Sequence, residues 1–159
     1  MGIFSKVVGW IEAREAKQSS RYADNYAHTR ETPEQFISAC RAKGAQCPEE
    51  IILGIRRVIA RLGKIDESFI NSGDTFDCDL IHLPFWDSLD AIAIVMELEV
   101  EFQTEISDKV LSEMLNPGLA RKGTTVADAV LNWGRVIAKI RSEQDGSASP
   151  ATRGSERPG

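Results

Sequence analysis

The sequence predicts an all-α protein, and three observations support this prediction. Apolar residues recur at helical spacing in several segments. Two segments open on a capping box, Thr32 with Gln35 and Thr125 with Asp128. No segment has the alternating pattern of a convincing strand, and no internal repeat is evident. With 159 residues, of which 42% are hydrophobic, the chain can build one core with appendages.

Two helices are predicted ahead of residue 48. The first spans residues 3 to about 18, where apolar side chains form one stripe: Ile3, Phe4, Val7, Val8 and Ile11. The second begins at Thr32 with a proline at its first helical position, runs for about three turns and ends at Gly44. Residues 1–47 are therefore interpreted as an N-terminal helical extension.

The next helix is predicted from Glu49 to Leu62, with acidic residues in its first turn and Gly63 beyond its last. Its apolar stripe consists of Ile51, Ile52, Ile55, Val58, Ile59 and Leu62. Residues 63–86 have neither a helical nor an alternating period, so we expect a long connection pinned by apolar anchors. These anchors are Ile65, Phe69, Ile70, Phe76 and Leu80.

A helix from Ser88 to about Phe102 carries two apolar lines. Ile94, Val95, Leu98 and Phe102 make an ordinary core stripe. Leu89, Ile92, Met96 and Val100 form a second line, flanked by Asp90, Glu97, Glu99 and Glu101. Because a helix of a monomer needs one buried stripe, the second line is either additional core, for example under the N-terminal extension, or a docking surface.

The C-terminal part is predicted to contain a short helical piece around residues 110–114 and a long last helix that opens at Thr124 or Thr125. The last helix is expected to bury Val126, Ala129, Val130, Trp133, Ile137 and Ile140. From Ser142 onward small and charged residues replace apolar ones, so residues 142–159 are predicted to be a disordered tail.

Charge is concentrated in the middle of the chain. Residues 48–108 hold 4 Lys and Arg against 14 Asp and Glu, a net charge of −10, whereas both flanks are mildly basic. Such a block repels nucleic acid and anionic lipid and attracts proteins with basic patches. The three cysteines lack a CxxC pair, which favours a reducing compartment, and we expect a cytoplasmic protein without membrane insertion.

Ser88 is the leading candidate for a functional residue. A hydroxyl at a helix N-terminus lies among unpaired N–H groups at the positive end of the helix dipole, where a phosphate esterified to it is stabilised. Three other interpretations were weighed. Ser88 could be a helix cap alone, or a nucleophile with His82 as base, although no Gly-x-Ser-x-Gly elbow surrounds it. A metal site from Cys78, His82, Asp77 and Asp79 fits no dedicated spacing.

These residues resemble the acyl carrier proteins, four-helix bundles that carry a 4'-phosphopantetheine arm on the serine of an Asp-Ser-Leu motif. The resemblance covers residues 48 to about 140. It runs through Asp87-Ser88-Leu89-Asp90, Val95-Met96, Leu98-Glu99, Glu101-Phe102, Thr104-Glu105-Ile106 and Asp108, and resumes at Thr124-Thr125-Val126. The resemblance implies an acyl-carrier-like domain over residues 48–141, with additional N-terminal helices.

The resemblance also implies a function and a set of functional residues. Ser88 would receive the arm from coenzyme A through a phosphopantetheinyl transferase, and Asp87 would help position the metal and phosphate during that transfer. The arm would hold acyl groups as thioesters for fatty-acid, lipid or polyketide-type biosynthesis, and the carrier itself would catalyse nothing. Acyl-transferring or condensing enzymes with basic patches would dock, weakly and salt-sensitively, on Leu89, Asp90, Ile92, Met96, Glu97, Glu99, Val100 and Glu101.

Several features depart from a minimal carrier, and two of them affect how partners would recognise the chain. Phe85-Trp86 replaces the small residues that normally precede the motif, and residues 1–47 have no counterpart. Both indicate a specialised pathway or dedicated partners. The alternatives are an aminoacyl or peptidyl carrier, and a carrier-like adaptor that binds proteins without a prosthetic group.

Overall fold

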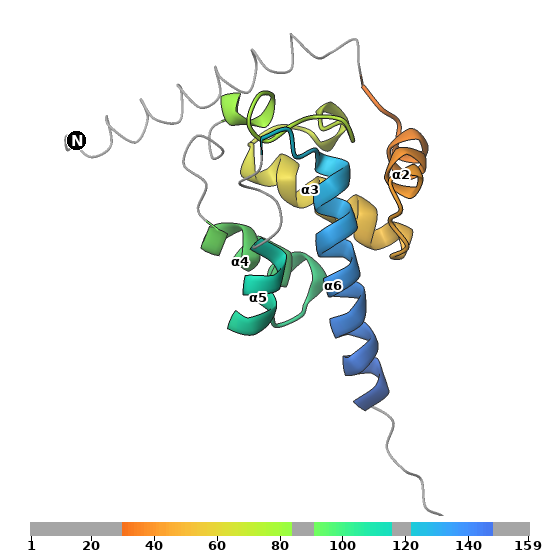
Figure 1. Ribbon diagram of the computed structural model, residues 1–159, viewed down its shortest axis with the longest axis vertical. Helices are drawn as coiled ribbons and strands as arrows, with labels where there is room; N and C mark the ends of the chain where they lie inside the picture. Colours follow the sequence, from red (N-terminus) through yellow and green to blue (C-terminus); the bar gives the residue numbers. More distant parts are fainter. Residues whose placement is uncertain (1–29, 84–90, 116–121, 148–159) are drawn as a thin grey trace, which may run out of the picture.

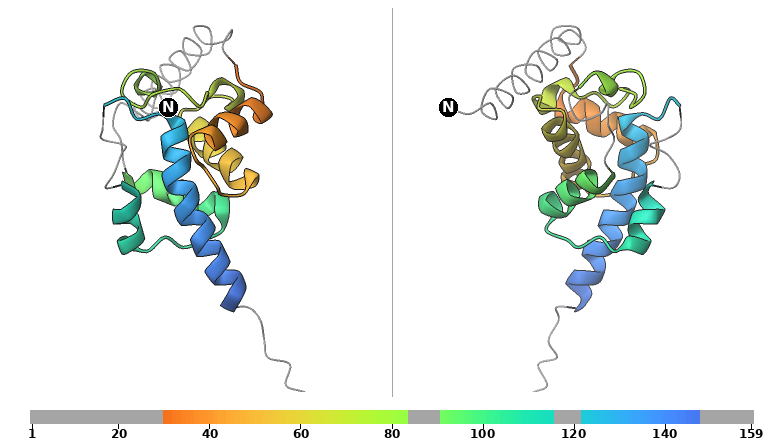
Figure 2. Two further views of the ribbon diagram at one scale, coloured as in Figure 1. Left: turned by 45° about the vertical axis from the view of Figure 1, so that its right-hand side comes forward. Right: turned by 90° about the vertical axis from the view of Figure 1, so that its left-hand side faces the viewer.

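Two long helices, α3 (Glu49–Leu62) and α6 (Val126–Ser147), pack against each other at the centre of the protein (Figure 1). The computed structural model describes residues 30–83, 91–115 and 122–147. Helix α2 (Pro33–Ala42) lies on one side of the central pair. Helices α4 (Ala91–Phe102) and α5 (Asp108–Leu115) lie on the other side, α4 against α3 and α5 against α6 (Figures 1 and 2).

The prediction of an all-α protein is confirmed over the described ranges. They contain no strand, and Thr75 and Thr125 meet in a single isolated antiparallel bridge. The helix predicted for residues 3–18 lies outside the described residues. Within the described part of the chain, no helix combines the length and the hydropathy needed to cross a membrane.

Helix α2 begins as its sequence predicts. The Gln35 N–H donates to Thr32 Oγ1 at 3.3 Å and the Thr32 N–H donates to Gln35 Oε1 at 2.9 Å, a reciprocal capping box. Phe36 and Cys40 are completely buried against the central helices. Helix α2 therefore shares one core with α3 and α6.

Most of the predicted apolar stripe of α3 is buried, and its last residue, Leu62, is partly buried. The residues that are at most 1% exposed are Ile51, Ile52, Ile55, Val58 and Ile59. Helices α3 and α4 approach closely at Gly54, where an added Cβ would come within 2.5 Å of the Phe102 ring. Glycine at this position lets α4 pack directly on the α3 backbone.

Residues 63–83 form the expected long connection, with two short 3₁₀ turns at Glu67–Phe69 and Leu80–His82. The predicted anchors Ile70, Phe76 and Leu80 are buried, and Ile65 and Phe69 pack on the core partly buried. Backbone hydrogen bonds also attach this connection to the start of α6. The N–H of Val126 donates to the Asp74 carbonyl at 2.9 Å and that of Phe76 donates to the Thr124 carbonyl at 3.1 Å.

One buried arginine joins three segments of the chain. Arg56 is 2% exposed, and its Nε donates to the Ile70 carbonyl while one of its terminal nitrogens donates to the Glu31 carbonyl, both at 2.8 Å. Its guanidinium lies 4.6 Å from the centre of the Phe36 ring. The Glu31 carboxylate in turn accepts from the N–H and the hydroxyl of Ser72, at 2.8 and 2.7 Å. This cluster ties the start of α2 to α3 and to the connection.

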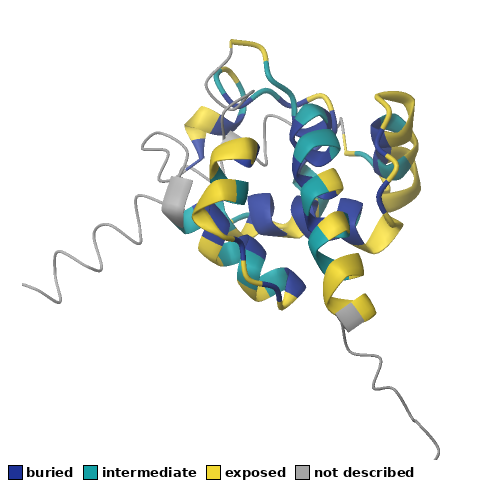
Figure 3. Cartoon of the chain, turned by 60° about the horizontal axis from the view of Figure 1, so that its bottom comes forward, coloured by how far each residue is buried: buried dark blue, intermediate teal, exposed yellow. Residues whose placement is uncertain are grey.

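Helix α6 opens on the second predicted capping box. The Thr125 N–H donates to the Asp128 carboxylate at 2.9 Å, and the Asp128 N–H donates to Thr125 Oγ1 at 3.2 Å. The predicted core positions are buried, apart from Ile140, which is partly buried: Val126, Ala129, Val130, Trp133 and Ile137. The helix continues through Ser147, beyond residue 142, where the sequence predicts a disordered tail. Its last turns project past the other helices and are exposed (Figure 3).

The three cysteines differ in their surroundings. Cys40 and Cys47 are buried, and Cys47 packs so closely on α6 that a Cβ at Gly134 would lie 2.5 Å from its sulfur. Cys78 is exposed on the connection. Burial raises the pKa of Cys40 to about 12 and also raises the pKa of Cys47.

Candidate functional site

Helix α4 is the part of the candidate site that the structure describes. Ser88, together with Asp87, Leu89 and Asp90, lies outside the described residues, as does the side chain of Ile92. The described helix begins at Ala91, three residues after the candidate serine.

The core-facing stripe of α4 is confirmed. Ile94 and Leu98 are at most 1% exposed, and Val95 and Phe102 are each 8% exposed. These side chains fix the rotation of α4 about its own axis, because they are the ones that contact the core.

The described part of the second apolar line lies at the surface. Met96 is 60% exposed and Val100 is 69% exposed. Both side chains are therefore exposed in the part of the chain that the structure describes. Their exposure is what a docking role requires.

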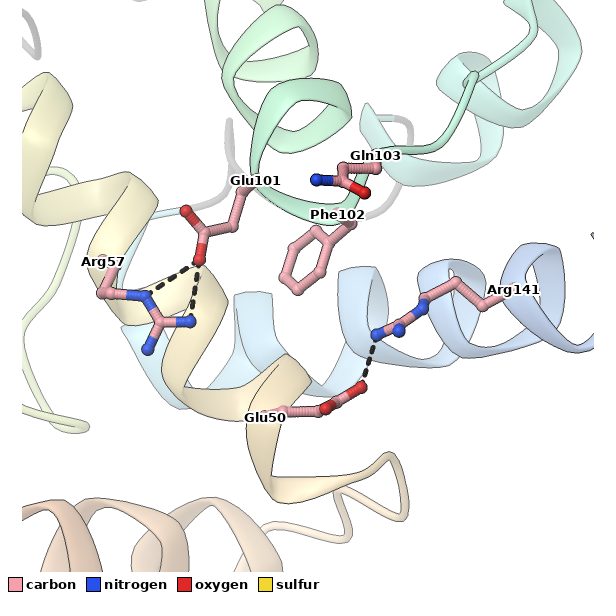
Figure 4. Close-up of a pocket in the computed structure, with 6 residues that line it drawn as sticks. All are labelled: Glu50, Arg57, Glu101, Phe102, Gln103 and Arg141. Carbon is pink, nitrogen blue, oxygen red and sulfur yellow. Dashed lines mark hydrogen bonds and ion pairs between the residues drawn. The ribbon is translucent and has the colours of Figure 1, made fainter.

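The acidic residues of α4 have partners within the chain itself. The Arg61 guanidinium lies 2.8 Å from Glu97 Oε2 and 2.9 Å from Glu101 Oε2. Arg57 contacts Glu101 Oε1 through two nitrogens, at 2.7 and 2.9 Å (Figure 4). Glu99 instead accepts the N–H of Ile106 at 2.8 Å, which holds the turn after α4.

Sequence reasoning treated the glutamates of α4 as contacts for partners and missed the two arginines. A signal for this pairing is present in the sequence. Arg57 and Arg61 are four residues apart on α3, and Glu97 and Glu101 are four residues apart on α4, so each pair shares one helix face. Packing of the two helices then brings the opposite charges together.

The carboxyl of Glu101 has a lowered pKa. Its partial burial alone would raise this pKa, but hydrogen bonds from Arg57 and Arg61 and the charges of these arginines outweigh burial. Because the pKa of Glu101 is lower in the folded state, its ion pairs with Arg57 and Arg61 stabilise the fold fully at pH values above its ordinary pKa of 4.5. This contribution is lost as the pH falls through the folded-state pKa.

Glu101→Gln is therefore expected to lower the free energy of unfolding at neutral pH by about 1 kcal/mol. The difference from wild type should shrink as the pH falls through the lowered pKa of Glu101, because the wild-type carboxyl then becomes protonated as well. Urea unfolding at several pH values measures this. The exposed Glu105→Gln serves as the matched control, and a Glu101→Gln deficit that persists unchanged in acid would contradict the assigned ion pairs.

A small polar pocket lies at the C-terminal end of α4. It has a volume of about 210 Å³ and is lined by Glu50, Arg57, Glu101, Phe102, Gln103 and Arg141 (Figure 4). Arg141 pairs with Glu50 on one side, and Arg57 pairs with Glu101 on the other. The four charged groups of this pocket therefore neutralise one another in pairs.

The acidic residues of the connection have structural roles. Asp79 accepts from the N–H and the hydroxyl of Thr75, at 2.7 and 2.8 Å, and Asp77 accepts from the N–H of Gly123 at 3.1 Å. Across residues 30–83, 91–115 and 122–147, no three His, Cys, Asp or Glu side chains are grouped as metal ligands would be. Asp77 therefore attaches the connection to the segment before α6, and Asp79 stabilises a turn within the connection.

Comparison of the chain with protein-family models, with curated proteins and with solved structures finds no match. Functional assignment therefore depends on the residues themselves.

Proposed function

We propose that this chain is an acyl carrier protein that holds acyl intermediates as thioesters on a 4'-phosphopantetheine arm attached to Ser88. The observation that carries the proposal is the motif Asp87-Ser88-Leu89-Asp90, which leads into α4. Its resemblance to carrier proteins extends along α4 and resumes at the start of α6. In this proposal the chain is a substrate of other enzymes and performs no catalysis.

The position of the serine supports the proposal. Only two residues of the sequence stand between Ser88 and Ala91, the first described residue of α4. In this proposal a phosphodiester on Ser88 is stabilised by the positive end of the helix dipole. The arm supplies a thiol for thioester formation. Asp87 contributes a carboxylate for positioning Mg²⁺ and phosphate while the transferase acts.

The arrangement of helices is compatible with the carrier fold. In this proposal α3, α4, α5 and α6 are the carrier bundle, and α2 is an addition that shares its core through Phe36 and Cys40. The exposed Met96 and Val100 supply a surface on which partner enzymes dock. The unpaired cysteines favour a cytoplasmic site of action.

The test is attachment of the arm. The full-length protein is incubated with coenzyme A, Mg²⁺ and a broad-specificity phosphopantetheinyl transferase, and its intact mass is measured. Wild type is expected to gain the mass of one phosphopantetheine, and Ser88→Ala is expected to gain none. Ser107→Ala, at an exposed serine before α5, is the matched control and should be modified like wild type.

Two outcomes would contradict the carrier assignment. Wild type without any added mass would favour the adaptor that binds proteins without a prosthetic group. Equal modification of wild type and Ser88→Ala would place the arm elsewhere.

A further inference from the structure

A cavity of about 380 Å³ lies between α6 and the turn that joins α2 to α3. The turn contributes Gly44, Gln46, Cys47 and Pro48 to its lining, and α6 contributes Leu131, Arg135 and Ala138. This volume falls within the range of pockets that bind small molecules. Among the described residues none of α4 lines the cavity, so it does not involve the helix that follows Ser88.

Hydrogen bonds and close packing hold the walls of the cavity in place. Arg41 donates to the Ala45 carbonyl at 2.9 Å, and the Ala45 N–H donates to the Cys40 carbonyl at 3.0 Å. The turn also packs directly on α6, because an added Cβ at Gly134 would lie 2.5 Å from the Cys47 sulfur. Walls that are fixed before a ligand arrives lower the entropy cost of binding it.

The lining combines an apolar surface with one charge. Cys47 is buried, Leu131 and Ala138 are partly buried, and all three line the cavity with apolar atoms. Among the described lining residues, Arg135 alone is charged. Binding sites for small molecules usually have this composition, in which apolar walls cover the ligand and a few polar groups select it.

Arg135 is available to an anion. It is exposed, and within the part of the chain that the structure describes it forms no ion pair, in contrast to Arg57 and Arg141. Burial raises the pKa of Cys47 and the positive charge of Arg41 opposes this rise, so a second cation acts on the same wall. Both charges favour a carboxylate, which a guanidinium binds through charge-assisted hydrogen bonds.

A neighbouring groove between α5 and α6 lacks this selectivity. Its lining includes Glu113 and Glu143 as well as Lys139 and Arg135, so groups of both signs face it. In the described ranges neither glutamate forms an ion pair with Arg135. The cavity beside the turn is therefore the one whose charge is of a single sign.

We propose that the cavity between α6 and the turn after α2 binds a small molecule with an apolar body and one carboxylate, which pairs with Arg135. This binding goes beyond the proposed carrier function, because it does not depend on an arm at Ser88. A thioester has no negative charge, so the cavity favours a free acid over cargo held as a thioester.

The test uses sodium octanoate as the probe and the full-length protein with isotope-labelled methyl groups. NMR titration is expected to shift the methyl signals of Leu131 and Ala138 in a saturable way, with a Kd of about 1 mM or tighter. The methyl signals of Ile81, an exposed apolar residue of the connection, should not move. Octylammonium, which has the same chain with the opposite charge, should bind at least about tenfold more weakly.

Three variants locate the site. Arg135→Gln is expected to raise the Kd for octanoate at least about fivefold. Lys139→Gln is the matched control, since it removes an exposed charge that does not line this cavity, and its Kd should stay within about twofold of wild type. Ala138→Phe fills the cavity and should abolish the shift of the Leu131 signals. Circular dichroism checks the fold of each variant.

The outcomes decide the inference. A wild-type titration without saturable shifts at Leu131 and Ala138 up to about 10 mM octanoate would overturn it. So would equal binding of octanoate and octylammonium, or a wild-type Kd for Arg135→Gln, and both tests stand even if Ala138→Phe does not fold. Ser88→Ala should bind octanoate like wild type, so a failure of arm attachment leaves this inference intact.

Discussion

Arg56→Met is expected to lower the free energy of unfolding by about 2–4 kcal/mol. The substitution keeps an apolar chain of similar length but removes both donors to the carbonyls of Ile70 and Glu31. Ile70 is completely buried, so its carbonyl loses a partner that water cannot easily replace. The contact of the guanidinium with the Phe36 ring is lost as well.

Urea unfolding followed by circular dichroism measures this effect. Arg57→Met is the matched control, because the neighbouring arginine is 45% exposed and its loss should cost about 1 kcal/mol or less. Arg56→Lys should recover only part of the loss, since one ammonium group lacks the fork that reaches two carbonyls. Equal stability of Arg56→Met and wild type would show that packing alone holds these three segments together.

Gly54→Ala is expected to destabilise the protein by about 1–3 kcal/mol, although alanine is the better helix former. The new Cβ would lie 2.5 and 2.6 Å from two atoms of the Phe102 ring. Phe102 is 8% exposed and belongs to the core stripe of α4, so the ring cannot move aside without disturbing the packing of α3 on α4.

Gly146→Ala is expected to change the stability in the opposite direction. Gly146 lies in α6, and an added Cβ there meets nothing within 4 Å. Only helix propensity changes at this position, so stability should rise by up to about 1 kcal/mol. Thermal and urea unfolding of both variants test the pair. If Gly54→Ala were as stabilising as Gly146→Ala, the close contact between α3 and α4 would be wrong.

Local signals made much of the helical structure predictable. The capping boxes at Thr32 and Thr125 depend on residues three positions apart, and both are present. The apolar stripes of α3 and α4 predict which side chains are buried, because a regular helix places these residues on one face. The end of α6 was harder to predict, since six polar or small residues after Arg141 continue the helix without a buried stripe.

Contacts between distant segments could not be predicted in the same way. Arg56 and Arg57 are neighbours between apolar residues of α3, yet the first is buried and the second is half exposed. The difference arises from Glu31 and Ile70, which lie on other segments and supply the acceptors. The same limit applies to the candidate site. The sequence predicts Glu101 as a contact for partner proteins, whereas in the structure Glu101 binds two arginines of α3.

The three cysteines differ in burial, so thiol reagents are expected to label the protein selectively at Cys78. Alkylating and disulfide reagents act on accessible thiolates. Cys40 and Cys47 are buried, and burial also raises the pKa of both thiols, so neither is expected to react readily. Cys78 is exposed on the connection between α3 and the segment that carries Ser88. A fluorophore or spin label can therefore be attached to the native chain at Cys78, without engineered cysteines, to report on events at the proposed attachment site.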